Sequence, residues 1–162
     1  MMKRNIKRRG FTLVELLIVI VVIGILSAMM MLSSTEAVTS AKASNIVSNL
    51  RNLKTAALAC YIDSMDHFDA NPTELPTKKR IVKYLNSGTE LPDSKDYEIV
   101  HDNTNNEWFL KYTVTGTTSE KTQIRQKLAG RAKSVGLLSA ASTTAAVYTA
   151  ANDANDVYYF VR

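Results

Sequence analysis

Residues 8–26, RRGFTLVELLIVIVVIGIL, decide how this chain folds. A basic block ends at Gly10, an acidic residue follows at Glu15, and the next twenty residues, 16–35, carry no charge. As a helix, this uncharged run is about 30 Å long at ~1.5 Å per residue, which matches the hydrocarbon core of a bilayer. Its side chains are apolar on every face, a pattern that a water-exposed helix does not show. The sequence therefore predicts a transmembrane helix over residues 11–35.

The residues before the apolar run form a targeting segment. Residues 1–10, MMKRNIKRRG, hold five of the twenty basic side chains and no acidic one. The remaining fifteen basic side chains balance the fifteen acidic ones, so the net charge belongs to this leader. The positive-inside rule then places the leader in the cytoplasm and exports the rest of the chain. Because the exported part is neutral, the composition does not favour nucleic acid as a partner.

Two common kinds of N-terminal segment explain part of this pattern. A secretory signal has a shorter apolar region with a small-residue cleavage site after it, whereas an uncleaved signal anchor fits the charge and length. Neither explains a glycine directly before the run or an acidic residue at its start. With both features, residues 8–26 resemble the class III signal of type IV prepilins and type II secretion pseudopilins.

The resemblance assigns roles to three residues. In that family a prepilin peptidase cuts after the glycine, and the new N-terminal amine is methylated. By position, the cut falls between Gly10 and Phe11, Phe11 is methylated, and Glu15 is the acidic fifth residue of the mature chain. A carboxylate in a membrane helix costs about 2.5–3.5 kcal/mol at mid-membrane, so Glu15 needs a partner. The cationic amine of Phe11, in the same or a neighbouring chain, would supply it and make Glu15 a charge-pairing residue in assembly.

Beyond the membrane run, the helix is expected to continue and become amphipathic. No proline or glycine occurs between Gly24 and Pro72. Apolar residues recur at spacings of three and four, which is the period of one helix face; they include Ile46, Leu50, Leu53, Ala57 and Tyr61. The sequence predicts one helix over roughly residues 12–65.

The rest of the chain predicts a small mixed domain. We expect a short helix over 78–86 capped by Thr77, strands over 97–102 and 107–115, and a final strand over 157–161. Thr117-x-x-Glu120 is a capping box for a helix to about residue 135, with Gly136 as its stop. Residues 139–156 are expected to be irregular, with a strand near 145–149 as one option. The predicted class is α+β, the type IV pilin-like lollipop: a long N-terminal helix packed on a small, mostly antiparallel sheet with one or two extra short helices.

Few residues suggest a chemical site. Asp63, Asp66 and His67 share one helix face, which we interpret as a solvated helix end rather than a metal site. Cys60 stands alone and is interpreted as a small buried side chain, with an intermolecular disulfide left open. The oxygen ligands near Asp153 and Asp156 leave open a calcium site of the kind some pseudopilins hold, without the spacing of an EF-hand. No catalytic residue and no cofactor is predicted.

Three functions remain, in a fixed order of preference. The resemblance implies a prepilin that polymerises into a type IV pilus, with its own copies, the prepilin peptidase, the inner-membrane assembly platform and minor pilins as partners. A pseudopilin of a secretion or competence system is the alternative, disfavoured because residues 91–97 lack an Asp-Pro-Trp-Gly-like segment. A membrane-anchored exported enzyme is the third. The expected organisation is a leader over 1–10, a transmembrane or filament-core helix half over 11–35, and the exported part over 36–162.

Overall fold

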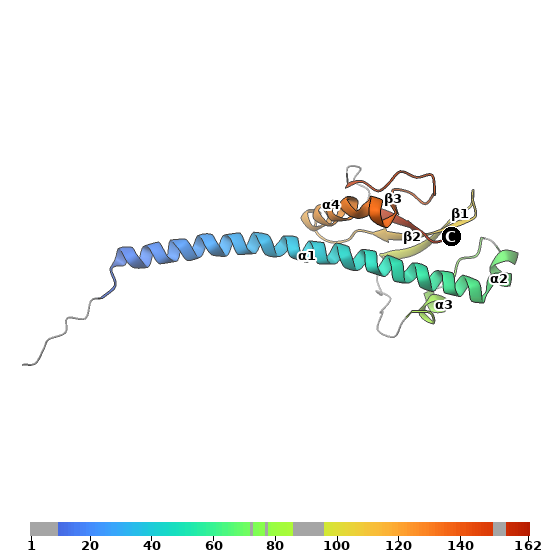
Figure 1. The fold of residues 1–162 in the computed structure, drawn as a ribbon, viewed down its shortest axis with the longest axis horizontal. Helices are drawn as coiled ribbons and strands as arrows, with labels where there is room; N and C mark the ends of the chain where they lie inside the picture. The colour runs from blue at the N-terminus through green and yellow to red at the C-terminus, as the bar shows by residue number, and fades with distance from the viewer. Residues whose placement is uncertain (1–9, 72, 77, 86–95, 151–154) are drawn as a thin grey trace, which may run out of the picture. The chain divides into compact units, whose positions relative to one another are not determined.

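The computed structural model describes residues 10–71, 73–76, 78–85, 96–150 and 155–162 (Figure 1). It divides into two compact units, residues 1–37 and residues 38–162, and each is described by itself. Helix α1 (Leu13–Asp63) begins in the first unit and continues into the second. The predicted helix over 12–65 is therefore confirmed in kind, with small differences at both ends.

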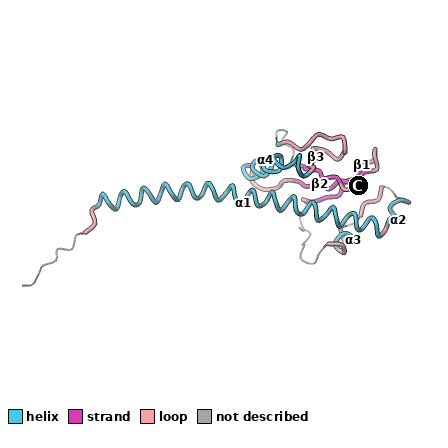
Figure 2. The backbone as a smooth tube through the Cα atoms, in the orientation of Figure 1, coloured by secondary structure: helices cyan, strands magenta, loops and turns pink. Residues whose placement is uncertain are grey.

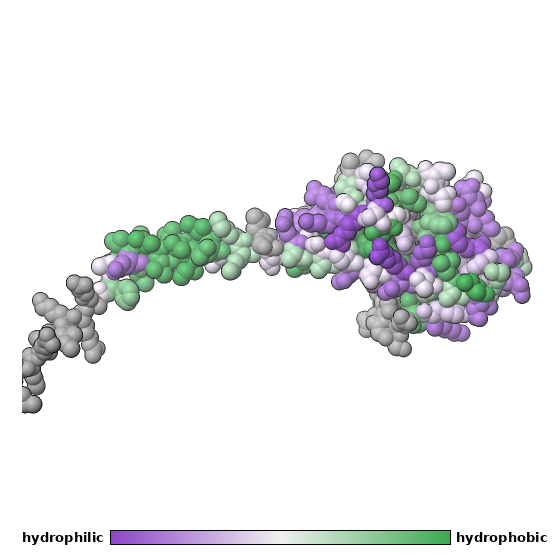
Figure 3. Space-filling model, viewed as in Figure 1, coloured by the Kyte–Doolittle hydropathy of each residue, from purple (hydrophilic) through white to green (hydrophobic). Residues whose placement is uncertain are grey.

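The first unit is dominated by the apolar part of α1. This is the helix, among the described residues, that is long and apolar enough to cross a membrane, and none of its most apolar 18-residue window is buried. The large apolar side chains between Leu13 and Met31 are all about half exposed or more, with exposed fractions from 48% for Val22 to 86% for Leu13. Figure 3 shows this stretch as a continuous hydrophobic surface. Such a surface requires a bilayer or other protein chains around it.

In the second unit, α1 contributes a row of buried side chains to the hydrophobic core. Its buried side chains follow the predicted amphipathic stripe and include Ala43, Ile46, Leu50, Leu53 and Ala57. The helix ends at Asp63, two residues before the expected end near Met65, and a separate helix α2 (Met65–Ala70) follows Ser64. The break directs Phe68 into the core, where it is fully buried and its ring packs edge-on against Trp108 at 5.1 Å.

Four antiparallel strands form a sheet in the described part of this unit (Figure 2). They are β1 (Tyr97–Asp102), β2 (Glu107–Thr113), β3 (Leu137–Leu138) and β4 (Asp156–Phe160), in the order β1-β2-β4-β3. β1 agrees with its predicted range, whereas β2 ends two residues earlier than predicted and β4 is shifted by one. The sequence did not predict β3, and the expected strand near 145–149 is reduced to a single bridge between Val147 and Leu138.

The inner face of the sheet carries the largest aromatic side chain of the core. Trp108 lies edge-on to Tyr61 of α1, with ring centroids 5.5 Å apart, and is fully buried. The guanidinium of Arg162 covers both rings, 3.8 Å from the centroid of Tyr61 and 4.7 Å from that of Trp108. Cation–π contacts of this kind add to the apolar burial that holds α1 on the sheet.

Two further helices complete the unit. Helix α3 (Lys78–Val82) is shorter than the predicted 78–86, and its expected cap Thr77 lies outside the described residues. Helix α4 (Thr118–Val135) has the predicted bounds and buries Ile124, Leu128 and Ala132. Its stop is also confirmed: Gly136 adopts φ 85°, a left-handed conformation that side chains disfavour.

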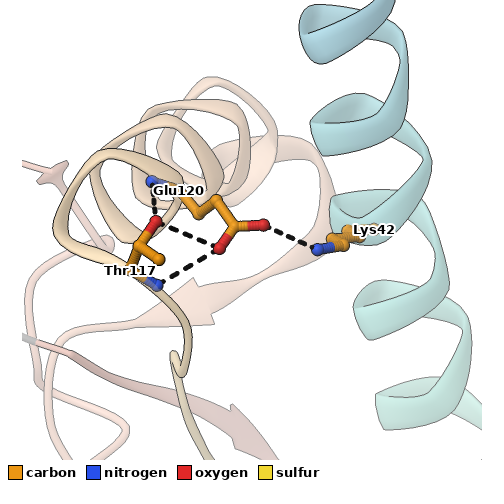
Figure 4. A network of polar contacts seen from close by, with 3 residues as sticks. All are labelled: Lys42, Thr117 and Glu120. Carbon is orange, nitrogen blue, oxygen red and sulfur yellow. Dashed lines mark hydrogen bonds and ion pairs between the residues drawn. The ribbon is translucent and has the colours of Figure 1, made fainter.

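The N-terminus of α4 is tied to α1 by one carboxylate (Figure 4). The Glu120 N–H donates to Thr117 Oγ1, and Glu120 Oε2 accepts from the Thr117 N–H at 3.2 Å, which completes the predicted capping box. Lys42 of α1 binds the other oxygen, Oε1, at 3.0 Å. The Lys42 ammonium and the capping hydrogen bonds hold the pKa of Glu120 below its usual value. Together these elements confirm the α+β class with a long N-terminal helix, a small antiparallel sheet and extra helices.

Candidate processing and assembly site

The Gly10–Phe11 peptide bond lies before the first residue of α1. Helix α1 begins at Leu13, so neither Gly10 nor Phe11 belongs to the helix. Phe11 is 94% exposed. A methyl group built at Gly10 meets no atom of the described residues within 4 Å, so packing among those residues does not require a glycine at this position. If only glycine is accepted at position 10, a partner of the chain imposes that requirement.

Thr12 and Glu15 form a reciprocal cap at the start of α1. The Thr12 N–H and hydroxyl both donate to Glu15 Oε2 at 2.7 Å, and the Glu15 N–H donates to Thr12 Oγ1 at 3.2 Å. This is the capping-box pattern, in which the residue before the helix and the third helical residue satisfy each other's backbone N–H groups. Glu15 thus has a partner within its own uncut chain, which the sequence reasoning missed although Thr12-x-x-Glu15 repeats the spacing of Thr117-x-x-Glu120.

The cap uses only one of the two carboxylate oxygens. All three contacts involve Oε2 or the Thr12 hydroxyl, and Oε1 has no hydrogen-bond partner among the described residues. An ionised carboxylate accepts hydrogen bonds on both oxygens. The geometry therefore leaves Oε1 able to accept from a cationic amine while Thr12 remains bound to Oε2.

Two of the polar residues that the sequence singled out, Asp63 and His67, have ordinary partners. His67 pairs with Glu74 at 3.0 Å, and the Tyr84 hydroxyl donates to Asp63. Within the described residues, no three His, Cys, Asp or Glu side chains are grouped so as to hold a metal ion. Cys60 is 1% exposed, and burial raises the pKa of its thiol, as expected for a small core residue.

The calcium site that the sequence left open falls mostly outside the described residues. Asp153 belongs to the undescribed stretch 151–154. Asp156 is described and lies at the start of β4, where its Oδ1 accepts from the Thr113 hydroxyl at 2.6 Å. This carboxylate therefore takes part in the hydrogen bonds between β2 and β4.

In a comparison with known protein families, one family model matches part of the chain. Residues 5–31 match the model of the prokaryotic N-terminal methylation motif. No curated protein and no solved structure matched the chain. The matched residues contain the Gly10–Phe11 bond and the Thr12–Glu15 cap, and they reach into the exposed apolar part of α1. The motif implies processing by a prepilin peptidase and assembly into pilus-type filaments, and it fits anchoring in a membrane. Over residues 5–31 the chain thus carries the class III signal that marks type IV pilins and pseudopilins.

Proposed function

We propose that this chain is the prepilin of a type IV pilus, cut between Gly10 and Phe11 and methylated on the amine of Phe11. The observation that carries the proposal is the methylation motif at residues 5–31 together with an apolar helix that buries none of its most apolar window in its own fold. The leader lies in the cytoplasm and the second unit on the outer side of the membrane, because the basic side chains precede the apolar run. The role is structural rather than enzymatic.

The start of α1 supports the role given to Glu15. In the uncut chain, Thr12 satisfies one carboxylate oxygen, so the carboxylate has a partner while the helix lies in the membrane. Cleavage then creates a cationic amine at Phe11, and methylation keeps its charge. In the filament this amine, or that of a neighbouring copy, binds the open Oε1. The pairing neutralises two charges as apolar helices pack together.

Two features favour a pilus over a pseudopilin of a secretion or competence system. The segment 91–97 has the sequence LPDSKDY, without the tryptophan and glycine of a major secretion pseudopilin. Helix α4, which is eighteen residues long, makes the second unit larger than a minimal pseudopilin domain. The pseudopilin stays the second candidate on the strength of the shared leader.

The cleavage step can be tested with two glycines that the fold does not need. A Cβ at Gly10 or at Gly24 meets no atom of the described residues within 4 Å, so packing among those residues excludes neither substitution. Gly10→Leu should leave a protein of precursor size in cells that hold a prepilin peptidase, whereas Gly24→Leu should be processed normally. Equal processing of both variants would refute a cut after Gly10.

The kind of filament can be tested by microscopy. Cells would be labelled with antibody against the second unit, with a deletion strain as the control. Long labelled surface fibres that disappear in the deletion strain support a pilus. An absence of fibres, combined with loss of protein secretion or DNA uptake in the deletion strain, would instead identify a pseudopilin.

A further inference from the structure

Side chains hold the two backbone N–H groups that a longer α1 would turn towards the leader. In an α-helix each N–H donates to the carbonyl four residues earlier, so a helix that included Phe11 would direct the Glu15 N–H to the Phe11 carbonyl. The Glu15 N–H instead donates to Thr12 Oγ1 at 3.2 Å. The Thr12 N–H, which a longer helix would also direct upstream, donates to Glu15 Oε2 at 2.7 Å. The cap therefore competes directly with extension of α1 towards its N-terminal side.

The first backbone hydrogen bond of α1 leaves the Gly10–Phe11 peptide bond outside the helix. The Leu16 N–H donates to the Thr12 carbonyl at 3.2 Å. Among the described residues, no backbone N–H donates to the carbonyl of Gly10 or of Phe11. Figure 2 draws the described residues before Leu13 as a loop. The Gly10 carbonyl is therefore able to accept a hydrogen bond from a partner.

The sequence before the bond offers little other opposition to a longer helix. Residues 3–9, KRNIKRR, contain neither glycine nor proline, and lysine and arginine are good helix formers. A membrane strengthens the tendency to extend, because an unpaired backbone N–H is costly in hydrocarbon. Gly10 disfavours a helix through its conformational freedom. The Thr12 cap and Gly10 are thus the two features of residues 3–12 that oppose extension of α1 through the bond.

We propose that Thr12 is a positioning residue for cleavage, because its hydroxyl caps α1 and keeps the Gly10–Phe11 bond outside the helix. The proposal rests on the cut that the proposed function assigns to this bond. A peptidase must polarise the carbonyl of the bond that it cuts. In a longer helix the Gly10 carbonyl would already accept from the Val14 N–H. Cleavage therefore depends on the fraction of chains in which the bond lies outside the helix.

The expected effect of losing the cap is a change in binding of the peptidase. One helix cap corresponds to roughly a fivefold change in the equilibrium between the two helix starts. Because only chains with an open bond bind productively, a smaller open fraction raises the apparent KM. The kcat should stay unchanged, since the bound chain is the same. Thr12→Val, which keeps the shape of threonine without the hydroxyl, should therefore raise KM by up to about fivefold.

The test uses the full chain in detergent micelles with a purified prepilin peptidase. Initial rates come from the separation of precursor and mature chains on gels, and intact mass gives the position of the cut. Thr12→Ser and Thr12→Asn supply a capping oxygen on side chains of different shape, whereas Thr12→Val supplies none. Both capping variants should be cut with a KM close to that of the wild type, and Thr12→Val with a higher one. Gly10→Leu serves as the uncut control.

The start of the helix is measured separately, in the uncut chain without peptidase. NMR chemical shifts of the Phe11 Cα should be non-helical in the wild type, Thr12→Ser and Thr12→Asn, and should move towards helical values in Thr12→Val. Slow cleavage of Thr12→Val with an unchanged Phe11 shift would overturn the proposal, by showing that the peptidase recognises the Thr12 side chain itself.

Two other outcomes separate this proposal from the proposed function. Equal KM values for all four chains, or a better substrate in Thr12→Val than in the two capping variants, would overturn the role of Thr12 and leave the cut after Gly10 intact. A wild-type chain that the peptidase does not cut between Gly10 and Phe11 would contradict the proposed function itself.

Discussion

Replacing Glu15 with glutamine separates the two roles that we give to this side chain. Glutamine keeps an oxygen that accepts from the Thr12 N–H, and it is the other residue that completes capping boxes. The start of α1 should therefore persist in Glu15→Gln. The substitution removes the negative charge, so any pairing with the Phe11 amine loses its ionic part.

The size of this loss follows from elementary electrostatics. Two opposite charges about 4 Å apart attract by about 4 kcal/mol at an effective dielectric constant of 20. Glutamine has a single carbonyl oxygen, which Thr12 occupies, so the group that replaces the open oxygen is an amide NH2, a donor that cannot accept from the Phe11 amine. The loss of about 4 kcal/mol for each added subunit lowers the equilibrium constant for elongation roughly a thousandfold, since 1.4 kcal/mol corresponds to a factor of ten.

Thr12→Val is the matched variant. It keeps the charge of Glu15 and removes the hydroxyl, which costs about 1 kcal/mol as a lost helix cap and so has a smaller effect on assembly. Sheared surface fibres would be collected by centrifugation and quantified by immunoblot, with precursor and mature forms separated on the same gel. We expect cleaved Glu15→Gln protein in the cells and few fibres outside them. Wild-type amounts of fibre from Glu15→Gln would refute the charge-pairing argument.

Three further predictions concern the second unit, and the fluorescence of the single tryptophan follows unfolding of the full chain in detergent. Leu50→Ala should lower the free energy of unfolding by about 2–5 kcal/mol, because Leu50 is fully buried; a loss below that range would mean that the core is not closely packed. Gly136→Ala should cost about 1–2 kcal/mol because of its left-handed backbone, whereas Gly130→Ala inside α4 should be neutral or stabilising; equal effects would contradict the assigned helix stop. Lys42 lowers the pKa of Glu120, so the contribution of this pair to stability is present above the ordinary pKa of a glutamate and is lost as the pH falls through the lower pKa of the folded state. Glu120→Gln should therefore reduce the dependence of the free energy of unfolding on pH in the acid range, as measured by urea unfolding. An unchanged pH dependence would exclude the pair.

The elements with strong local signals could be predicted from the sequence. Helix α4 has its predicted bounds because Thr117-x-x-Glu120 caps one end and Gly136 ends the other. The alternation of Trp108, Leu110 and Tyr112 with Phe109, Lys111 and Thr113 predicted β2, although Phe109 is itself apolar and fully buried. Such signals are contained in a few neighbouring residues, so they survive without knowledge of the tertiary fold.

The elements that depend on distant partners could not be predicted. β3 has two residues, too few to show a period, and exists because Leu137 and Leu138 pair with Tyr159 and Tyr158 of β4. The end of α1 at Asp63 likewise reflects the burial of Phe68 against a strand some forty residues later.

The candidate site shows a different kind of failure. Thr12-x-x-Glu15 carries the same capping signal as α4, but Glu15 was interpreted through its charge alone, and its local partner Thr12 was missed.

The central claim is that the chain is cut between Gly10 and Phe11 to become a filament subunit. N-terminal sequencing and intact mass measurement of protein recovered from the cell surface test it most directly. The account predicts a mature chain that begins with N-methylated Phe11. A mature chain that begins downstream of Ser27, or one that retains the leader, would contradict it.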